Sequence, residues 1–114
     1  MTEGCLFCAI AAGAIPAAVV HADDQVLAFR DIAPTAPVHL LVIPRSHYPD
    51  IVSLTTAMPH LTGHLIDVAG RVAAAEGCAG GFRLVFNTGD DGGQTIGHVH
   101  AHVLGGRQLQ WPPG

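Results

Sequence analysis

Residues 97–106 read GHVHAHVLGG and place histidines at positions 98, 100 and 102, with small apolar residues between them. Successive side chains of an extended chain point to opposite faces, so the histidines share one face and the residues between them face a core. This alternation predicts a half-buried strand over 99–104. Neighbouring imidazoles of the row are anchored about 6.6 Å apart, and its two ends about 13 Å apart. The three histidines therefore cannot all bind one metal ion, which can take at most two of them.

The segments before this strand alternate between apolar runs and turn residues. They predict strands over 17–21, 26–31, 39–43 and 81–87, in addition to 99–104. A short helix is expected over 5–12 and a long one over 54–77, where apolar residues recur every three or four positions. Thr55 or Thr56 can cap the long helix, and Pro59 fits its first turn. Because the strands follow one another without alternating helices, we expect an α+β domain built on a five-stranded antiparallel sheet.

Composition limits the function classes. The chain has 114 residues, of which 49% are hydrophobic and 12% charged, which predicts one packed domain over residues 1–114. The net charge of −4 argues against a nucleic-acid partner, and the lack of lysine excludes a P-loop or a Schiff-base mechanism. No signal peptide or membrane span is expected. The odd count of three cysteines then favours a reducing compartment, so we expect a cytoplasmic protein.

The histidine row has three interpretations: polar side chains on a solvated face, ligands to a metal, or groups that act on a bound substrate. A neutral imidazole serves as nucleophile and as general acid or base near pH 7, and a protonated one neutralises an anion. The preceding loop, DDGGQT (90–95), offers backbone N–H groups that glycines allow to approach phosphate oxygens. Together the row and the loop point to phosphoryl or nucleotidyl transfer.

Cys5 and Cys8 form a C-x₂-C pair in CLFC (5–8). The spacing suits a metal site, but one pair alone also fits a disulfide or two buried thiols. Cys78 and His21 have no predicted role. His60 and His64 are four residues apart on the long helix, where a solvated face is a simpler explanation than a ligand pair.

The stretch HVHAHVL matches the H-φ-H-φ-H-φ-φ signature of the histidine triad (HIT) superfamily. Residues 87–114 and 15–47 resemble its Hint branch, the histidine triad nucleotide-binding proteins. The resemblance implies a HIT-like fold that pairs into a two-fold homodimer. The tail around Trp111 resembles the segment that reaches the other subunit's active site in such dimers.

In this family the resemblance implies a hydrolase that cleaves the phosphorus–nitrogen bond of purine nucleoside 5'-phosphoramidates, such as AMP-linked amines, without an organic cofactor. The reaction would pass through a covalent nucleotidyl-histidine. A histidine at position 102, where the transferase branch has glutamine, favours hydrolysis over nucleotide exchange. The alternatives are a dinucleoside polyphosphate hydrolase and a zinc-stabilised nucleotide-binding or scaffold protein with little catalysis.

The resemblance also implies roles for individual residues. His100 would be the nucleophile, His102 would contact the phosphate, His98 and His39 would orient the nucleophile, and Thr95 would lie near the leaving group. The implied nucleotide-binding residues are Phe29, Asp31, Ile32, Asn87, Gly93, Gln94, Thr95, His100 and His102.

Proteins of the bacterial type resemble this chain in pairing the two cysteines with two histidines. The implied metal ligands are Cys5, Cys8, His47 and His98. Four protein ligands close the coordination shell, so the ion would be a structural Zn²⁺.

Overall fold

The computed structural model describes residues 3–114, and within them the chain forms three helices and five strands. In chain order the elements are α1 (Leu6–Ala11), β1 (Val19–Ala22), β2 (Val26–Arg30), β3 (Val38–Pro44), α2 (Ile51–Ala57), α3 (Pro59–Ala75), β4 (Arg83–Val85) and β5 (Ala101–Gly105). The strands form one antiparallel sheet in the order β1-β2-β3-β5-β4. The predicted α+β class and five-stranded sheet are therefore confirmed.

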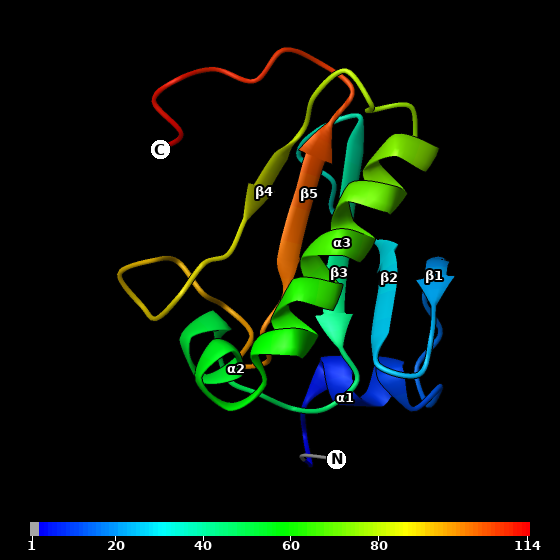
Figure 1. Ribbon diagram of the computed structural model, residues 1–114, viewed down its shortest axis with the longest axis vertical. Coiled ribbons are helices and arrows are strands. Elements are labelled where there is room, and N and C mark those ends of the chain that lie inside the picture. The colour runs from blue at the N-terminus through cyan, green and yellow to red at the C-terminus, as the bar shows by residue number, and fades with distance from the viewer. Residues whose placement is uncertain (1–2) are drawn as a thin grey trace.

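The central strand β3 separates two apolar layers. Leu40 and Val42 point into the main core, where α3 lies across the sheet, as Figure 1 shows. Leu41 and Ile43 point to the opposite face and pack there with Phe7 of α1. The alternation of β3 thus assigns α3 and α1 to opposite faces of the sheet.

The histidine row follows the predicted alternation. The residues between the histidines, Val99, Ala101 and Val103, are buried in the core beneath α3. His102 pairs with Leu41 across β3 and β5, so it lies on the α1 face of the sheet. The predicted strand begins two residues too early, because β5 starts at Ala101 and the two earlier histidines lie in the extended segment before it.

The single helix predicted over 54–77 is wrong. The chain forms α2 and α3 instead, with a break at Met58, whose φ of −140° and ψ of 69° lie outside the helical region. A residue before proline is sterically kept out of that region, and Pro59 therefore begins a new helix. The predicted threonine caps are also wrong, because Asp50 caps α2 by accepting a 2.8 Å hydrogen bond from the Ser53 N–H.

The edge strand over 81–87 is shorter than predicted and covers only Arg83–Val85. Beyond it the chain leaves the sheet as the loop that leads back to the histidine row. Across residues 3–114, no helix combines the length and apolar character needed to cross a membrane.

The turn between β1 and β2 gives His21 and His64 a structural role that the sequence did not predict. Asp23 Oδ2 accepts from His21 Nε2 at 2.7 Å and from His64 Nε2 of α3 at 2.8 Å. Its Oδ1 accepts the N–H groups of Gln25 and Val26, each at 2.8 Å. Burial opposes ionisation of Asp23, but the bonds from His21, the two backbone N–H groups and His64 hold its pKa well below the usual range. Asp23 therefore ties the first hairpin to α3.

Candidate functional site

Backbone contacts fix the positions of the protons on His39 and His102. The Thr35 N–H donates to His39 Nδ1 at 3.1 Å, so a neutral His39 ring carries its proton on Nε2. That Nε2–H donates to His102 Nδ1 at 2.9 Å, with Asp31 Oδ2 3.3 Å away as a second acceptor. His102 is left with its proton on Nε2. It can therefore donate a hydrogen bond to a ligand while uncharged.

The pKa of His102 is lowered to about 4, first by burial and then by the positive charge that His100 and His39 carry when protonated. The carboxylate of Asp31 opposes this shift. His102 is consequently neutral at physiological pH, and it interacts with an anion through its N–H group rather than through a full charge.

The His100 side chain is buried beside Phe7 and His102. Its Nδ1–H donates to the backbone carbonyl of His98 at 2.9 Å, which leaves the lone pair on Nε2. The His100 and His102 rings are 5.0 Å apart between centroids, and Phe7 lies 5.1 Å from His100 in an edge-to-face contact. The arrangement provides a fixed, unprotonated ring nitrogen beside an N–H donor, which is what nucleophilic attack on a phosphorus centre requires.

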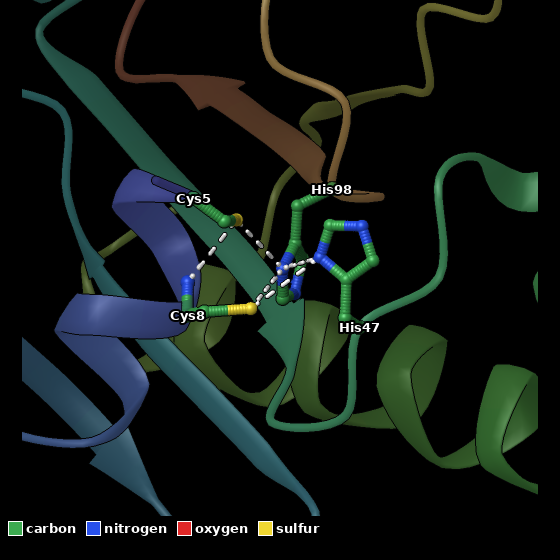
Figure 2. A group of neighbouring side chains, drawn as sticks. All are labelled: Cys5, Cys8, His47 and His98. Carbon is green, nitrogen blue, oxygen red and sulfur yellow. Dashed lines mark hydrogen bonds between the residues drawn. The ribbon is translucent and has the colours of Figure 1, made fainter. Parts of the chain in front are cut away.

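His98 is fully buried and belongs to a second cluster (Figure 2). Its Nε2–H donates to the carbonyl of Pro44 at 2.9 Å, so the Nδ1 lone pair faces away from that carbonyl. This Nδ1 lies 3.4 Å from Cys5 Sγ, 3.5 Å from Cys8 Sγ and 3.2 Å from His47 Nδ1. Cys8 lies in α1 and Cys5 is the N-cap residue of that helix, whereas His47 lies in the loop after β3.

The donor atoms of Cys5, Cys8, His47 and His98 all lie within 4.8 Å of one another, close enough to hold a metal ion. A tetrahedral zinc ion with ordinary bond lengths separates two nitrogen ligands by about 3.3 Å, and a nitrogen from a sulfur by about 3.5 Å. The observed nitrogen–nitrogen separation is 3.2 Å and the nitrogen–sulfur separations are 3.4–3.5 Å. The residues therefore fit such an ion.

The protonation state of this cluster also suits a metal. The bond to Pro44 fixes the His98 tautomer, with the proton on Nε2 and the Nδ1 lone pair toward the other three ligands, which is the usual outer-shell arrangement at metal centres. Burial lowers the pKa of His98, the bond to Pro44 opposes this shift, and the charge that His47 and His100 carry when protonated lowers the pKa further. Burial raises the pKa of the Cys5 thiol, so without a cation Cys5 remains protonated.

The loop between β4 and β5 is held by two of the predicted nucleotide-binding residues. Asn87 Nδ2 donates to the Gly92 carbonyl at 2.8 Å. Gln94 Nε2 donates to the carbonyls of Pro49 and Ile96, and its Oε1 accepts from the Gly89 N–H at 3.0 Å. Gln94 is thus occupied in shaping the loop. Gly93 adopts a positive φ of 78°, which glycine tolerates without strain.

A cavity of about 460 Å³ adjoins Asp31 and is walled mainly by apolar side chains. Phe29 and Ile32, both predicted to contact a base, line it, and Ile32 is fully exposed at its edge. Residues of α1 that the sequence analysis missed also line it: Leu6, Phe7 and Ile10. Their signal is the apolar character of the predicted helix over 5–12, which the sequence analysis used for its helix and its two cysteines but not for a pocket wall.

Thr95 and Trp111, two residues that the sequence predicted for the site, lie away from His100 and His102. Thr95 lines a separate hollow together with Cys5 and His47. Trp111 lies in the irregular tail and is 81% exposed. The site therefore has three parts: the His39–His100–His102 group, the adjoining apolar cavity, and the cysteine–histidine cluster, which shares His98 with the row.

Comparison with known proteins shows the family. The model of the HIT domain matches residues 12–109, and the chain belongs to this family. An uncharacterised HIT-like protein of Synechococcus elongatus is 49% identical over 100% of both chains. The crystal structure of a HIT family hydrolase from Legionella pneumophila is similar with a TM-score of 0.93 and 50% identity, covering 97% of this chain and 100% of that one. A histidine triad protein from Clostridium difficile gives a TM-score of 0.91 and 40% identity, covering 96% of both chains.

Proposed function

We propose that this protein is a hydrolase of the Hint branch that cleaves the phosphorus–nitrogen bond of purine nucleoside 5'-phosphoramidates, such as AMP-linked amines. The observation that carries the proposal is the bond from His100 Nδ1–H to the His98 carbonyl, which leaves Nε2 unprotonated beside the N–H donor of His102. A structural neighbour named a HIT family hydrolase supports the general reaction class.

In the proposed mechanism, His100 Nε2 attacks the α-phosphorus and a new nitrogen–phosphorus bond forms as the bond to the amine breaks. The amine nitrogen takes up a proton from solvent as it leaves, and Thr95 is proposed to act near this leaving group. Water then attacks the nucleotidyl-histidine, which releases the nucleoside monophosphate and restores His100. His102, held by His39, donates to the phosphoryl oxygens in both steps, where charge builds up in the transition state.

The apolar cavity is proposed to hold the purine. Its walls include Phe29 and Ile32, and Asp31 at its side is placed to accept the two ribose hydroxyls. The loop with Gly92 and Gly93 is proposed to present backbone N–H groups to the phosphate, with Asn87 and Gln94 holding the loop in shape.

The cysteine–histidine cluster is proposed to hold a structural Zn²⁺, which would link α1 to the sheet through four protein ligands and leave no open position. Elemental analysis of the purified protein should give one zinc per chain. A Cys5→Ala/Cys8→Ala double variant should contain none, whereas Cys78→Ala, which changes a buried cysteine outside the cluster, should retain it. Equal zinc in all three proteins would contradict the proposal.

We propose a symmetric homodimer in which the Trp111 tail reaches the partner's site, because a tryptophan this exposed gains stability when it is covered. Sedimentation analysis should give a dimer, and Trp111→Ala should change the preference among amine leaving groups. We further propose a single domain working in the cytoplasm, where its three free cysteines would stay reduced.

The activity test offers an AMP-linked amine and a dinucleoside polyphosphate to the wild-type protein and to His100→Ala. We expect release of AMP from the amine conjugate, and a loss of at least about a thousandfold in the variant. Faster cleavage of the dinucleoside polyphosphate would instead favour the sibling hydrolase. Tight AMP binding with no turnover of either compound would favour a nucleotide-binding scaffold.

A further inference from the structure

Helix α1 takes part in two sites at once. Two of its neighbouring residues, Leu6 and Phe7, line the apolar cavity. The residues on either side of them, Cys5 and Cys8, belong to the cysteine–histidine cluster. One short stretch of four residues is therefore shared between the candidate metal site and the candidate base pocket.

The helix has little to hold it in place by itself. It spans six residues, below the length at which an isolated helix is stable in water. Its main anchors are the buried Phe7, which meets Phe29 edge-to-face at 5.7 Å, and a 2.8 Å bond from Arg45 to the Ala11 carbonyl. A metal bound through Cys5 and Cys8 would hold this segment by two metal–sulfur bonds, one on each side of Leu6 and Phe7.

Two of the groups at the phosphate end, His39 and His102, do not depend on α1 in this way. His39 and His102 lie on β3 and β5, and their orientation comes from each other and from Thr35. A change in the order of α1 should consequently alter the walls around the base more than the groups around the phosphate.

We propose that metal binding at the cysteine–histidine cluster and purine binding in the α1 cavity are coupled through α1, so that each ligand raises the affinity for the other. The inference rests on the proposed nucleoside site. The loss of entropy on ordering α1 is incurred by whichever ligand binds first, and the second ligand then binds to a helix already in place.

The test measures binding rather than turnover. Calorimetry compares AMP and ribose 5-phosphate on the zinc-loaded protein and on protein stripped with a chelator, after circular dichroism has shown that both are folded. We expect AMP to bind roughly tenfold more weakly to the stripped protein, within the range usual for coupled sites. Ribose 5-phosphate, which lacks the base, should bind equally to both.

The reverse measurement uses Co²⁺, whose visible absorption reports thiolate coordination. AMP should raise the affinity for Co²⁺ by the same factor that Co²⁺ raises the affinity for AMP, because coupling between binding sites is reciprocal. Leu6→Ala keeps all four metal ligands but removes part of the cavity wall. In this variant AMP should bind more weakly, and its effect on Co²⁺ affinity should shrink.

The outcomes separate the two proposals. If the zinc-loaded protein does not bind AMP, the proposed nucleoside site is wrong. If AMP binds with one affinity to loaded and stripped protein, the coupling is refuted while the proposed function stands. An equal loss for AMP and ribose 5-phosphate would also refute it, because the effect of the metal would then not act on the binding of the base. A stripped protein that is unfolded leaves the decision to Leu6→Ala, where an undiminished effect of AMP on Co²⁺ affinity would overturn the coupling.

Discussion

His102 should make the protein less stable in mild acid, and His102→Gln should remove that contribution. The folded protein holds the pKa of His102 at about 4, whereas the free side chain has a value of 6.5. Between these values the unfolded chain binds a proton that the folded chain does not, so stability falls as the pH drops from 6.5 toward 4. The full difference corresponds to about 3 kcal/mol. His102 is partly solvated, so we expect about 2 kcal/mol in practice.

The assay is urea unfolding of metal-loaded wild type and His102→Gln at several pH values from 7.5 to 4.5, with the free energy taken from midpoint and slope. Wild type should lose about 2 kcal/mol more than the variant over this range. Contributions of other groups, including His98, are shared by both proteins and cancel in the difference. Parallel curves for the two proteins would refute the inferred proton positions and the burial of His102.

Three further predictions concern residues that shape the fold around the site. Asp23→Asn should destabilise the protein by about 2 kcal/mol in thermal or urea unfolding, because four hydrogen bonds to the carboxylate are weakened or lost. The loss of stability should be largest above pH 4, where Asp23 is ionised. Gly92→Ala should lower AMP affinity at least tenfold in calorimetry, because the new Cβ would clash with the Thr88 carbonyl oxygen and the loop must move. The control Gly97→Ala, whose added Cβ has no atom within 4 Å, should bind AMP normally. Leu65→Ala should cost about 3 kcal/mol of stability in urea, because Leu65 is fully buried on the inner face of α3, while AMP affinity should be unchanged.

The sequence predicted those parts of the structure that follow from local periodicity. Val99, Ala101 and Val103 alternate with the histidines, and this alternation alone placed the two sets on opposite faces of the sheet. The break between α2 and α3 was also available, since Pro59 excludes a helical Met58, but the apolar periodicity on both sides suggested one continuous helix.

Contacts between distant segments could not be predicted in this way. Nothing near Asp23 in the sequence indicates that His64, 41 residues later, donates to its carboxylate. The Thr35 N–H that fixes the His39 tautomer lies in a proline-rich loop whose conformation has no periodic signal. The proximity of the C-x₂-C pair to His47 and His98 was expected only from the resemblance to histidine triad proteins, because the fold brings these segments together across 39 and 93 residues.

The covalent intermediate on His100 is the most direct test of the proposed function. Wild-type protein is mixed with an AMP-linked amine, quenched within milliseconds in denaturant at alkaline pH, and analysed by intact and peptide mass spectrometry. We predict one nucleotidyl group per chain, carried by the peptide that contains His100 and absent from His100→Ala. Release of AMP without any adduct at the earliest times, or an adduct on another residue, would contradict the assignment of His100 Nε2 as the nucleophile.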